Sequence, residues 1–441
     1  MTNINRREFV KLAGGFFAAG MMWFPYIAKG AGGKIVIVGG GTGGATAAKY
    51  LRLTDPNLEI TLIEPSKEYH TCYLSNEVII GERTLESLTF VYDGLRKRGV
   101  NIVHDSVVGI DPVAKKVTTA SGAIFNYDRA VISPGIGFNW DAIEGYNEQV
   151  AAQIAPHAWK AGPQTLLLQK QLQAMPDGGK VIIVAPPNPF RCPPGPYERA
   201  SLIAHYLQQH KPKSKVIVLD SKDNFSKKPL FIQAWTKLYG YGTDNALIDL
   251  IDGPKGGKVE SFDSETMTLQ TEIEEFKGDV VCIIPAQKAA KIAVESGLVA
   301  GAWCPVNKRT FESTKHAGVY VIGDASDAAK MPKSAYSANC QAKIAAMAIV
   351  DSLSGREPGI AAYTNTCYSI AGKDYGFSVA GVYQLSADGK TIDDVKIGKD
   401  SEGKDLLAGG STPIDASPEM LKREVAYAHS WFKNLTQDVF A

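Results

Sequence analysis

The most regular feature of the chain is a set of short, β-branched apolar runs that end at glycine, proline or an acidic residue. Segments 34–38 and 59–64 are two such runs, and both have the composition of buried parallel strands. The alanine-rich segment 43–53 between them is typical of a helix. This order predicts a βαβ unit. The same order returns roughly 145 residues later, in segments 181–184, 200–209 and 215–220.

Further apolar runs complete the pattern. Strands are expected at 127–135, 279–284 and 318–322, and a helix at 337–353. Short strands at 101–103 and 116–118 are expected to belong to an inserted sheet. The tail alternates in polarity around 377–379 and ends in a predicted helix at 417–432.

We therefore predict an α/β fold with two Rossmann-like, glutathione-reductase-like dinucleotide-binding domains and a C-terminal α+β domain. The first domain is expected in two parts, 31–150 and 286–360. The second is expected at 151–285, and the C-terminal domain at 361–441.

Residues 1–30 have the organisation of an export signal. Arg6 and Arg7 precede an apolar run from 12 to about 27, and small residues follow at 28–31. The arginine pair resembles the twin-arginine signal, so we expect a cleaved signal peptide at 1–30 and a periplasmic protein. A retained membrane anchor is the alternative, but the run contains glycines and Pro25 and falls short of a span.

Composition narrows the function. Of the 441 residues, 45% are apolar and the formal net charge is +1, so nothing points to nucleic acid. No segment after the signal is apolar over a bilayer's thickness, so we expect no stable membrane insertion of the mature chain.

A glycine-rich turn follows the first predicted strand. Gly39, Gly41 and Gly44 satisfy the G-x-G-x-x-G pattern. Thr42 lies within it. The glycines permit a tight turn, close approach of a pyrophosphate and close packing of helix on strand. Glu64 ends the next strand, where an acid can accept from both ribose hydroxyls. The pattern predicts a dinucleotide site; a glycine turn without a ligand is the alternative.

Segment 314–324 indicates which dinucleotide is expected. Its sequence ends in Gly323 and Asp324 and resembles the late motif of glutathione-reductase-like flavoproteins. The resemblance implies that Asp324 accepts a hydrogen bond from a ribityl hydroxyl of FAD. A helix N-cap is the alternative role for this aspartate.

The second βαβ unit lacks the glycines that the first one keeps. Segment 185–196 is rich in proline at this point. Proline has no N–H to offer a phosphate, and its ring stiffens the loop. We therefore expect that this unit does not bind NAD, and that the loop presents Cys192 in a rigid bed of prolines.

The six cysteines stand at positions 72, 192, 282, 304, 340 and 367, without a Cys-x-x-Cys pair. We therefore expect no metal site and no haem attachment on this chain. Cys282 lies in an apolar strand, and Cys282, Cys304 and Cys340 are interpreted as structural.

Several segments together resemble the flavoprotein subunit of flavocytochrome c sulfide dehydrogenase. They extend from the first strand to near the C-terminus and comprise 39–49, 70–77, 157–165, 191–199, 332–339 and 365–370. The Thr-Cys-Tyr-Leu-Ser-Asn run at 71–76 and the proline-bedded Cys192 are the most specific of these features.

The resemblance implies site residues and partners. It implies that the 8α-methyl group of FAD is bonded covalently to Cys72. It implies a redox disulfide between Cys192 and Cys367 against the flavin, with Glu198 as a candidate proton acceptor. It also implies a separate c-type cytochrome subunit, which carries the haem c and contacts the C-terminal domain. Cys340 stands where a serine is expected, and it could compete for a disulfide with Cys192 or Cys367.

The expected activity is oxidation of sulfide to sulfur or polysulfide, with electrons passing through FAD to the cytochrome. A sulfide:quinone oxidoreductase is the first alternative, since it shares the fold and a cysteine pair but needs an apolar membrane-facing patch. An NAD(P)H-dependent persulfide reductase is disfavoured by the proline loop. A non-catalytic flavin subunit that only docks a cytochrome is disfavoured by the cysteine pair.

Two aromatic residues of the last predicted helix, Tyr427 and Trp431, are interpreted chiefly as packing residues. A place beside the approach to flavin or haem is their alternative role.

Overall fold

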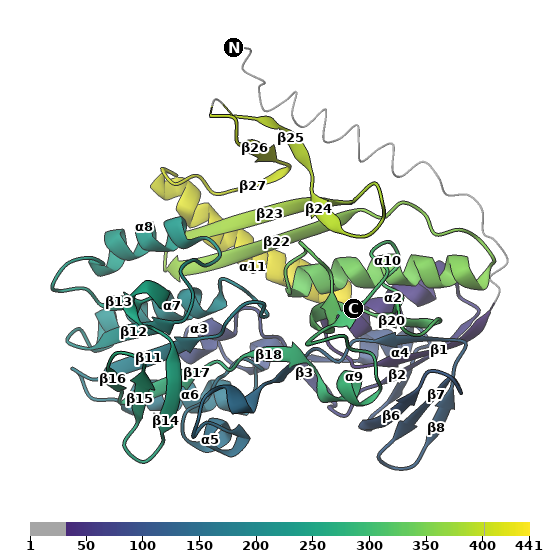
Figure 1. Cartoon of the computed structure of the whole chain (residues 1–441), viewed down its shortest axis with the longest axis horizontal. Helices are drawn as coiled ribbons and strands as arrows, with labels where there is room; N and C mark the ends of the chain where they lie inside the picture. Colours follow the sequence, from purple (N-terminus) through teal and green to yellow (C-terminus); the bar gives the residue numbers. More distant parts are fainter. Residues whose placement is uncertain (1–31, 401) are drawn as a thin grey trace.

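The computed structural model of the chain describes residues 32–400 and 402–441. The predicted signal peptide at 1–30 lies outside the described residues. Two α/β units lie side by side, and the C-terminal strands and a long helix lie across them (Figure 1).

The first unit is built on a five-stranded parallel sheet. Its central strands are apolar at nearly every position because helices or loops cover both faces. Helices α2 (Thr42–Thr54) and α10 (Ala335–Leu353) pack against each other beside this sheet. In spatial order the strands are β20 (Val319–Val321), β9 (Arg129–Ile132), β1 (Gly33–Val38), β2 (Leu58–Ile63) and β5 (Asn101–Val103).

One strand assignment from the sequence is wrong. Segment 101–103 was expected in an inserted sheet, but β5 pairs in parallel with β2 and forms the edge of the main sheet. Three residues are too few for the pattern to distinguish these positions. The inserted sheet consists of β6 (Val107–Asp111), β7 (Lys116–Thr119) and β8 (Ile124–Asn126).

The second unit repeats the architecture with four parallel strands. They are β13 (Ile248–Ile251), β12 (Lys215–Asp220), β11 (Lys180–Ala185) and β17 (Val280–Ile283). Its helices are α6 (Pro163–Ala174), α7 (Gly195–His210) and α8 (Lys228–Tyr239), and a small sheet contains β14 (Val259–Asp263), β15 (Thr268–Thr271) and β16 (Glu275–Lys277). Helix α7 begins five residues before the predicted position 200, because Pro196 fits the first helical turn, where no N–H donor is required.

An antiparallel pair joins the two units. Strand β10 (Ile136–Phe138) leads out of the first unit and pairs with β18 (Gln287–Ala289), which leads back into it. The remaining short elements are β3 (Glu68–His70), α3 (Ser75–Ile79), β4 (Thr89–Val91), α4 (Asp93–Lys97), α5 (Glu148–Gln153), α9 (Lys291–Glu295), β19 (Cys304–Pro305) and β21 (Ser326–Asp327).

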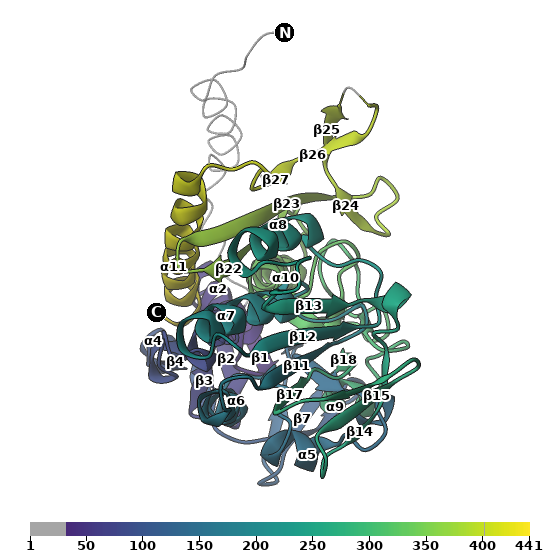
Figure 2. The ribbon, with the colours of Figure 1, turned by 90° about the vertical axis from the view of Figure 1, so that its left-hand side faces the viewer.

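The C-terminal part is a sheet crossed by the last helix (Figure 2). Strands β22 (Tyr363–Gly372) and β23 (Tyr375–Leu385) are long and antiparallel, and β24 (Ile392–Asp394) and β27 (Gly409–Ser411) pair with β23. A hairpin of β25 (Lys396–Lys399) and β26 (Asp405–Leu407) projects from the body. Helix α11 (Pro418–Phe440) extends beyond the predicted end at 432, because Leu435, Val439 and Phe440 are buried against the first unit.

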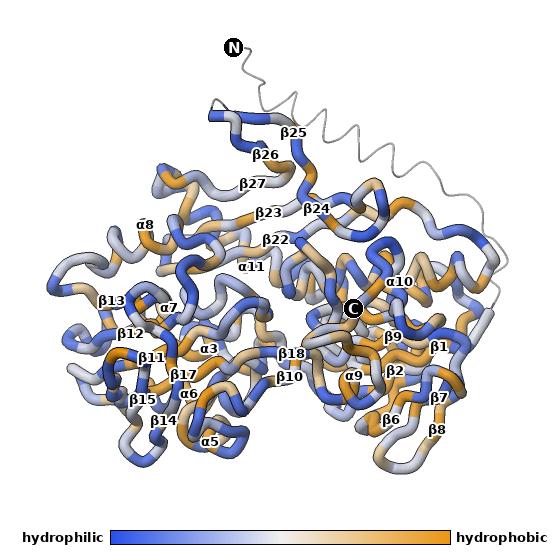
Figure 3. Tube along the Cα trace, in the orientation of Figure 1, coloured by the Kyte–Doolittle hydropathy of each residue, from blue (hydrophilic) through white to orange (hydrophobic). Residues whose placement is uncertain are grey.

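The apolar residues concentrate in the strands of the two parallel sheets, whereas the protruding loops are mostly polar (Figure 3). Within the described residues, no helix combines the length and the apolar character that crossing a membrane requires. The architecture confirms the predicted fold class, with two Rossmann-like units and a C-terminal α+β part.

Candidate active site

A cavity extends from the β1–α2 turn towards the start of α10. It brings together seven of the eight residues that the sequence assigns to the dinucleotide. These are Gly39, Gly41, Thr42, Glu64, Cys72, Gly323 and Asp324. The eighth, Gly44, lies behind the turn, and a Cβ atom on it would approach the carbonyl oxygen of Gly39 to 1.8 Å. Gly44 therefore acts through close packing of helix on strand.

The turn has the properties of a phosphate cradle. Gly39 has a φ of 96°, and a Cβ atom there would lie 2.4 Å from the carbonyl oxygen of Ser133. Helix α2 begins with neither a side-chain cap nor an acidic residue in its first turn. Its leading N–H groups and the positive end of its dipole are therefore left for an anion.

Glu64 and Asp324 mark two other points of this cavity. The carboxylate of Glu64 accepts from the backbone N–H groups of Gly40 (2.8 Å) and Ser66 (3.0 Å), which fixes its position after β2. The Oδ1 atom of Asp324 is buried and has no hydrogen-bond partner among the described residues. Burial raises the pKa of Asp324, although the charges of Arg191 and Lys333 oppose the shift.

An orphaned buried acceptor is costly unless a donor satisfies it, and a ribityl hydroxyl is such a donor. The alternative role of Asp324 as a helix N-cap is wrong, because Ser334 caps α10 through a bond from the N–H of Ser337. The glycine cradle, the acid after β2 and the unpaired Asp324 together fit an FAD molecule.

A second cavity adjoins the first. Cys192, Cys367 and Glu198 line it. Cys72 and Arg191 line both cavities, so Cys72 lies at their junction. In the described part of the chain, no disulfide is formed, and Cys192 and Cys367 are separate thiols. The structure thus gathers the three predicted catalytic residues in one cavity, which the predicted tether also lines.

Three of the eight non-glycine residues with positive φ in the described chain line this second cavity. Leu74, Ala158 and Cys192 line it, and their φ angles are 64°, 44° and 56°. Residues other than glycine rarely adopt positive φ, and each such residue costs on the order of 1–3 kcal/mol. Strain of this kind persists where function requires a fixed side-chain position.

The carboxyl group of Glu198 is held at both oxygens. Its Oε2 accepts from Asn76 Nδ2 at 3.0 Å, and its Oε1 accepts from the backbone N–H of Ile370 at 2.9 Å. Asn76 is oriented in turn by buried Arg199, whose Nε donates to its Oδ1 at 3.1 Å. Burial raises the pKa of Glu198 to about 7, although these hydrogen bonds favour the charged form. A carboxyl group with this pKa can exchange a proton near neutral pH.

Comparison with known proteins assigns the family. Residues 33–172 match the family model of pyridine nucleotide-disulphide oxidoreductases. Residues 165–285 match the central part of the sulfide dehydrogenase [flavocytochrome c] flavoprotein chain, and 360–440 match the flavin-binding part of flavocytochrome c sulphide dehydrogenase. The sulfide dehydrogenase [flavocytochrome c] flavoprotein chain of Chlorobaculum thiosulfatiphilum is 53% identical over 45 residues, which are 94% of that sequence and 10% of this chain.

The chain belongs to the flavocytochrome c sulfide dehydrogenase flavoprotein family.

More distant relatives share the fold of this flavoprotein. The mitochondrial sulfide:quinone oxidoreductase of Dictyostelium discoideum is 25% identical over 308 residues, and the match spans 67% of this chain but only 65% of that relative. The solved sulfide:quinone oxidoreductase of Aquifex aeolicus is 20% identical, with a TM-score of 0.68 over 92% of both chains. At this identity the structural likeness establishes the architecture.

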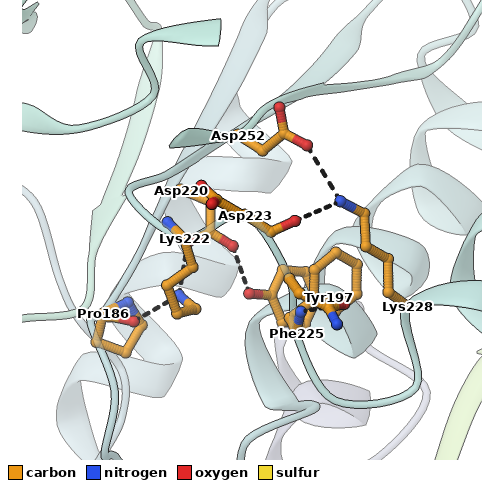
Figure 4. A network of polar contacts seen from close by, with 9 residues as sticks. Pro186, Tyr197, Asp220, Lys222, Asp223, Phe225, Lys228 and Asp252 are labelled. Atoms are coloured by element: carbon orange, nitrogen blue, oxygen red, sulfur yellow. Dashed lines mark hydrogen bonds and ion pairs between the residues drawn. The ribbon is translucent and has the colours of Figure 1, made fainter. Parts of the chain in front are cut away.

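The second nucleotide unit of this flavoprotein is filled by its own side chains (Figure 4). Asp220 ends β12, the position from which an acid binds the ribose in NAD enzymes. Here its oxygens accept from the hydroxyl of Tyr197 (2.5 Å) and pair with Lys222 (2.5 Å). Phe225 stacks on Tyr197 with ring centroids 3.5 Å apart. At the phosphate position Pro196 has no N–H and Glu198 places an acid in the first turn of α7, whereas the first turn of α2 contains neither a proline nor an acid.

We therefore expect NADH to leave the oxidised flavin of this protein unchanged. Binding would require the buried Asp220–Lys222 pair to open and the Tyr197–Phe225 stack to separate. The check is the flavin absorbance during anaerobic addition of NADH, with dithionite as the control that the flavin is reducible. Bleaching by NADH would show that the second unit still accepts a nicotinamide.

The other three cysteines line neither of the two cavities. Cys282 accepts from Arg199 Nη1 at 3.0 Å and lies in β17, and Cys304 is fully buried. Cys340 is buried on α10, with its sulfur 3.4 Å from the carbonyl oxygen of Ala362. Their surroundings suit the structural role expected of them.

The structure also adds residues that sequence reasoning missed. Asn76 and Ile370 donate hydrogen bonds to the carboxyl group of Glu198, and Lys227 donates one to the carbonyl oxygen of Cys367. Asn76 stood in the run that carries the resemblance, but Ile370 acts through its backbone N–H, which no side-chain pattern reveals. Of the two aromatic residues on α11, Trp431 lines the cysteine cavity, whereas Tyr427 is 51% exposed.

Proposed function

We propose that this chain oxidises sulfide to sulfur or polysulfide through Cys192, Cys367 and a bound FAD, and that a c-type cytochrome subunit takes the electrons. The observation that carries the proposal is the placement of both cysteines and Glu198 in one cavity, which meets the dinucleotide cavity at Cys72. The family assignment and the names of the relatives support sulfide as the substrate.

The protein's own groups perform the sulfur chemistry in this proposal. Cys192 and Cys367 form a disulfide in the oxidised enzyme, and hydrosulfide attacks one of its sulfurs, giving a persulfide and a thiolate. Glu198 accepts the proton as the persulfide forms. A second sulfide, or a growing chain, releases the product. FAD, tethered at Cys72 and held by the α2 turn and Asp324, supplies a two-electron acceptor that can pass electrons on singly.

The role of Glu198 predicts a pH dependence. Because its pKa is raised to about 7, the carboxyl group is protonated below that pH and cannot act as a base. We expect kcat/KM for sulfide to rise with pH through about 7 and Glu198→Gln to lower it by ~10² to 10⁴-fold. Sulfide itself titrates in this range, so the pH profiles of wild type and variant are compared.

The exposed Glu86 offers a matched control. Glu86→Gln should keep both the rate and the profile of the wild type. A Glu198→Gln enzyme with the wild-type profile and rate would remove this carboxyl group from the mechanism.

The electron acceptor is the second part of the proposal. The predicted twin-arginine signal, and hence the periplasm, supports a soluble haem partner. A quinone acceptor is the competing function, since relatives that share the fold are named sulfide:quinone oxidoreductases. Sulfide-dependent reduction of a c-type cytochrome is compared with reduction of a ubiquinone analogue under the same conditions. Faster cytochrome reduction supports the proposal, and faster quinone reduction overturns it.

A further inference from the structure

The two cysteines of the site have different surroundings. Cys367 lies on β22, where Asn365 and Ser369 are two residues away on either side and therefore point to the same face. The Nδ2 atom of Asn365 lies 3.3 Å from the sulfur of Cys367 and donates to it, while the protonated thiol reaches Oδ1 of the same amide at the longer distance of 3.7 Å. The other end of this buried amide, Oδ1, accepts from the hydroxyls of Ser334 (2.6 Å) and Ser337 (3.2 Å).

Both serine hydroxyls donate to Oδ1 in this structure, so the Nδ2 end of the amide is the end nearer to the sulfur. The N–H end of Asn365 is therefore directed at the sulfur of Cys367. A sulfur that faces an N–H donor is stabilised as an acceptor, and the thiolate is the stronger acceptor.

Lys227 adds a positive charge beside the backbone of Cys367. It immediately precedes α8, and its Nζ donates to the carbonyl oxygen of Cys367 at 3.0 Å and to the hydroxyl of Ser369 at 3.1 Å. Its backbone is held at a φ of 63°, a strained conformation for lysine. Burial lowers the pKa of Lys227. Negative charge at Cys367 opposes this shift most strongly, followed by negative charge at Glu198 and at Cys192.

Cys192 has the opposite environment. Burial raises the pKa of its thiol well above the ordinary value, and the carboxyl group of Glu198 is the next largest cause. Arg191 acts in the other direction but more weakly than these. A carboxylate close to a sulfur disfavours a thiolate there.

We propose that Cys367 is the thiolate of the cysteine pair, with Asn365 and Lys227 as its positioning residues, and that the persulfide therefore forms on Cys192. This inference rests on the proposed function in one respect, the disulfide that sulfide opens. Hydrosulfide bonds to the sulfur of Cys192, the S–S bond breaks, and Cys367 leaves with the electron pair as the thiolate. The hydrosulfide proton stays on the persulfide until Glu198 takes it.

Other titratable groups near Cys367 also affect the stability of a thiolate there. Besides Lys227 they are Glu198 on α7, Cys192 on the proline loop, Tyr383 on β23 and, beyond Lys227, Glu424 on α11. Lys227 is the one group among them that carries a positive charge, so its removal should have the largest effect on the Cys367 thiol.

The test is competitive alkylation of the reduced, flavin-loaded protein. Limiting iodoacetamide is added at pH values from about 5 to about 9, and mass spectrometry measures the labelling of each cysteine. We expect Cys367 to react first, with its labelling rising at lower pH than that of Cys192. A thiol pKa lower by one unit gives ~10 times more thiolate but a weaker nucleophile, so the preference should be roughly threefold or more.

Variants separate charge from structure. Lys227→Met should raise the pH at which Cys367 is labelled, and Lys227→Arg should restore it. Asn365→Asp, which keeps the shape but replaces the N–H donor, should act like Lys227→Met. Lys228→Met is the matched control, because Lys228 bonds to Asp252 and to the backbone of Asp223.

Faster labelling of Cys192 in the wild type, or an unchanged Cys367 profile in Lys227→Met that retains its flavin, would overturn the inference. The outcome is independent of turnover. If sulfide fails to reduce the flavin while Cys367 is still the more reactive thiol, the proposed function fails and the assignment of the thiolate stands.

Discussion

Replacing Cys192 or Cys367 with serine is expected to lower sulfide oxidation by on the order of 10³-fold or more, with FAD still bound. A serine oxygen cannot form the bond that hydrosulfide opens, so each single variant should be as inactive as the double variant. Flavin should be retained, because neither cysteine lines the dinucleotide cavity. The measurements are sulfide-dependent cytochrome reduction and the flavin-to-protein ratio.

Cys340→Ser is the matched control for these variants. Cys340 is buried on α10 and lines neither cavity, and serine is the residue expected there in related chains. It should keep both turnover and flavin. A Cys192→Ser, Cys367→Ser double variant with wild-type turnover would remove the cysteine pair from the mechanism, and an inactive Cys340→Ser enzyme would show that Cys340 belongs to it.

The second large effect is expected at Cys72. In the wild type, flavin should stay with the polypeptide after acid precipitation, because a thioether survives unfolding of the protein. In Cys72→Ser, flavin should appear almost completely in the supernatant. The position of Cys72 at the junction of the two cavities makes it the cysteine available to both the cofactor and the reactive pair.

The Cys72→Ser variant also separates tethering from binding. The α2 turn, Glu64 and Asp324 remain, so the native variant should still bind FAD reversibly. Cys282→Ser, on β17 outside both cavities, should keep its flavin bound covalently. Free FAD in the supernatant of the acid-treated wild type would contradict the tether.

The fold could be predicted wherever local patterns determine structure. Apolar runs such as 34–38 and 215–220 became strands because a sheet covered on both faces needs apolar residues throughout. The sequence pattern assigns segment 101–103 to the wrong sheet and ends the last helix too early, at residue 432. Both depend on contacts with remote parts of the chain, β2 in one case and the aromatic cluster around Phe440 in the other.

The candidate site divides in the same way. Gly39 and Glu64 could be named from the sequence because their chemistry depends on local spacing, whereas the role of Cys192 was implied by the family resemblance. The support for Glu198 could not be predicted, because Asn76 and the N–H of Ile370 come from elements far apart in sequence. The prolines of the second nucleotide unit predict that it does not bind NAD, but the Tyr197–Phe225 stack that fills it could be found only from the fold.

The most direct test of the proposed function is an anaerobic titration of the purified, oxidised flavoprotein with sulfide, followed through the flavin absorbance. We predict that the oxidised-flavin band disappears after roughly two equivalents of sulfide, since the first sulfide opens the disulfide, a second releases the product, and two sulfides joined by one S–S bond yield two electrons. Subsequent addition of the c-type cytochrome should restore it. An oxidised band that persists in excess sulfide, although dithionite removes it, would contradict the account.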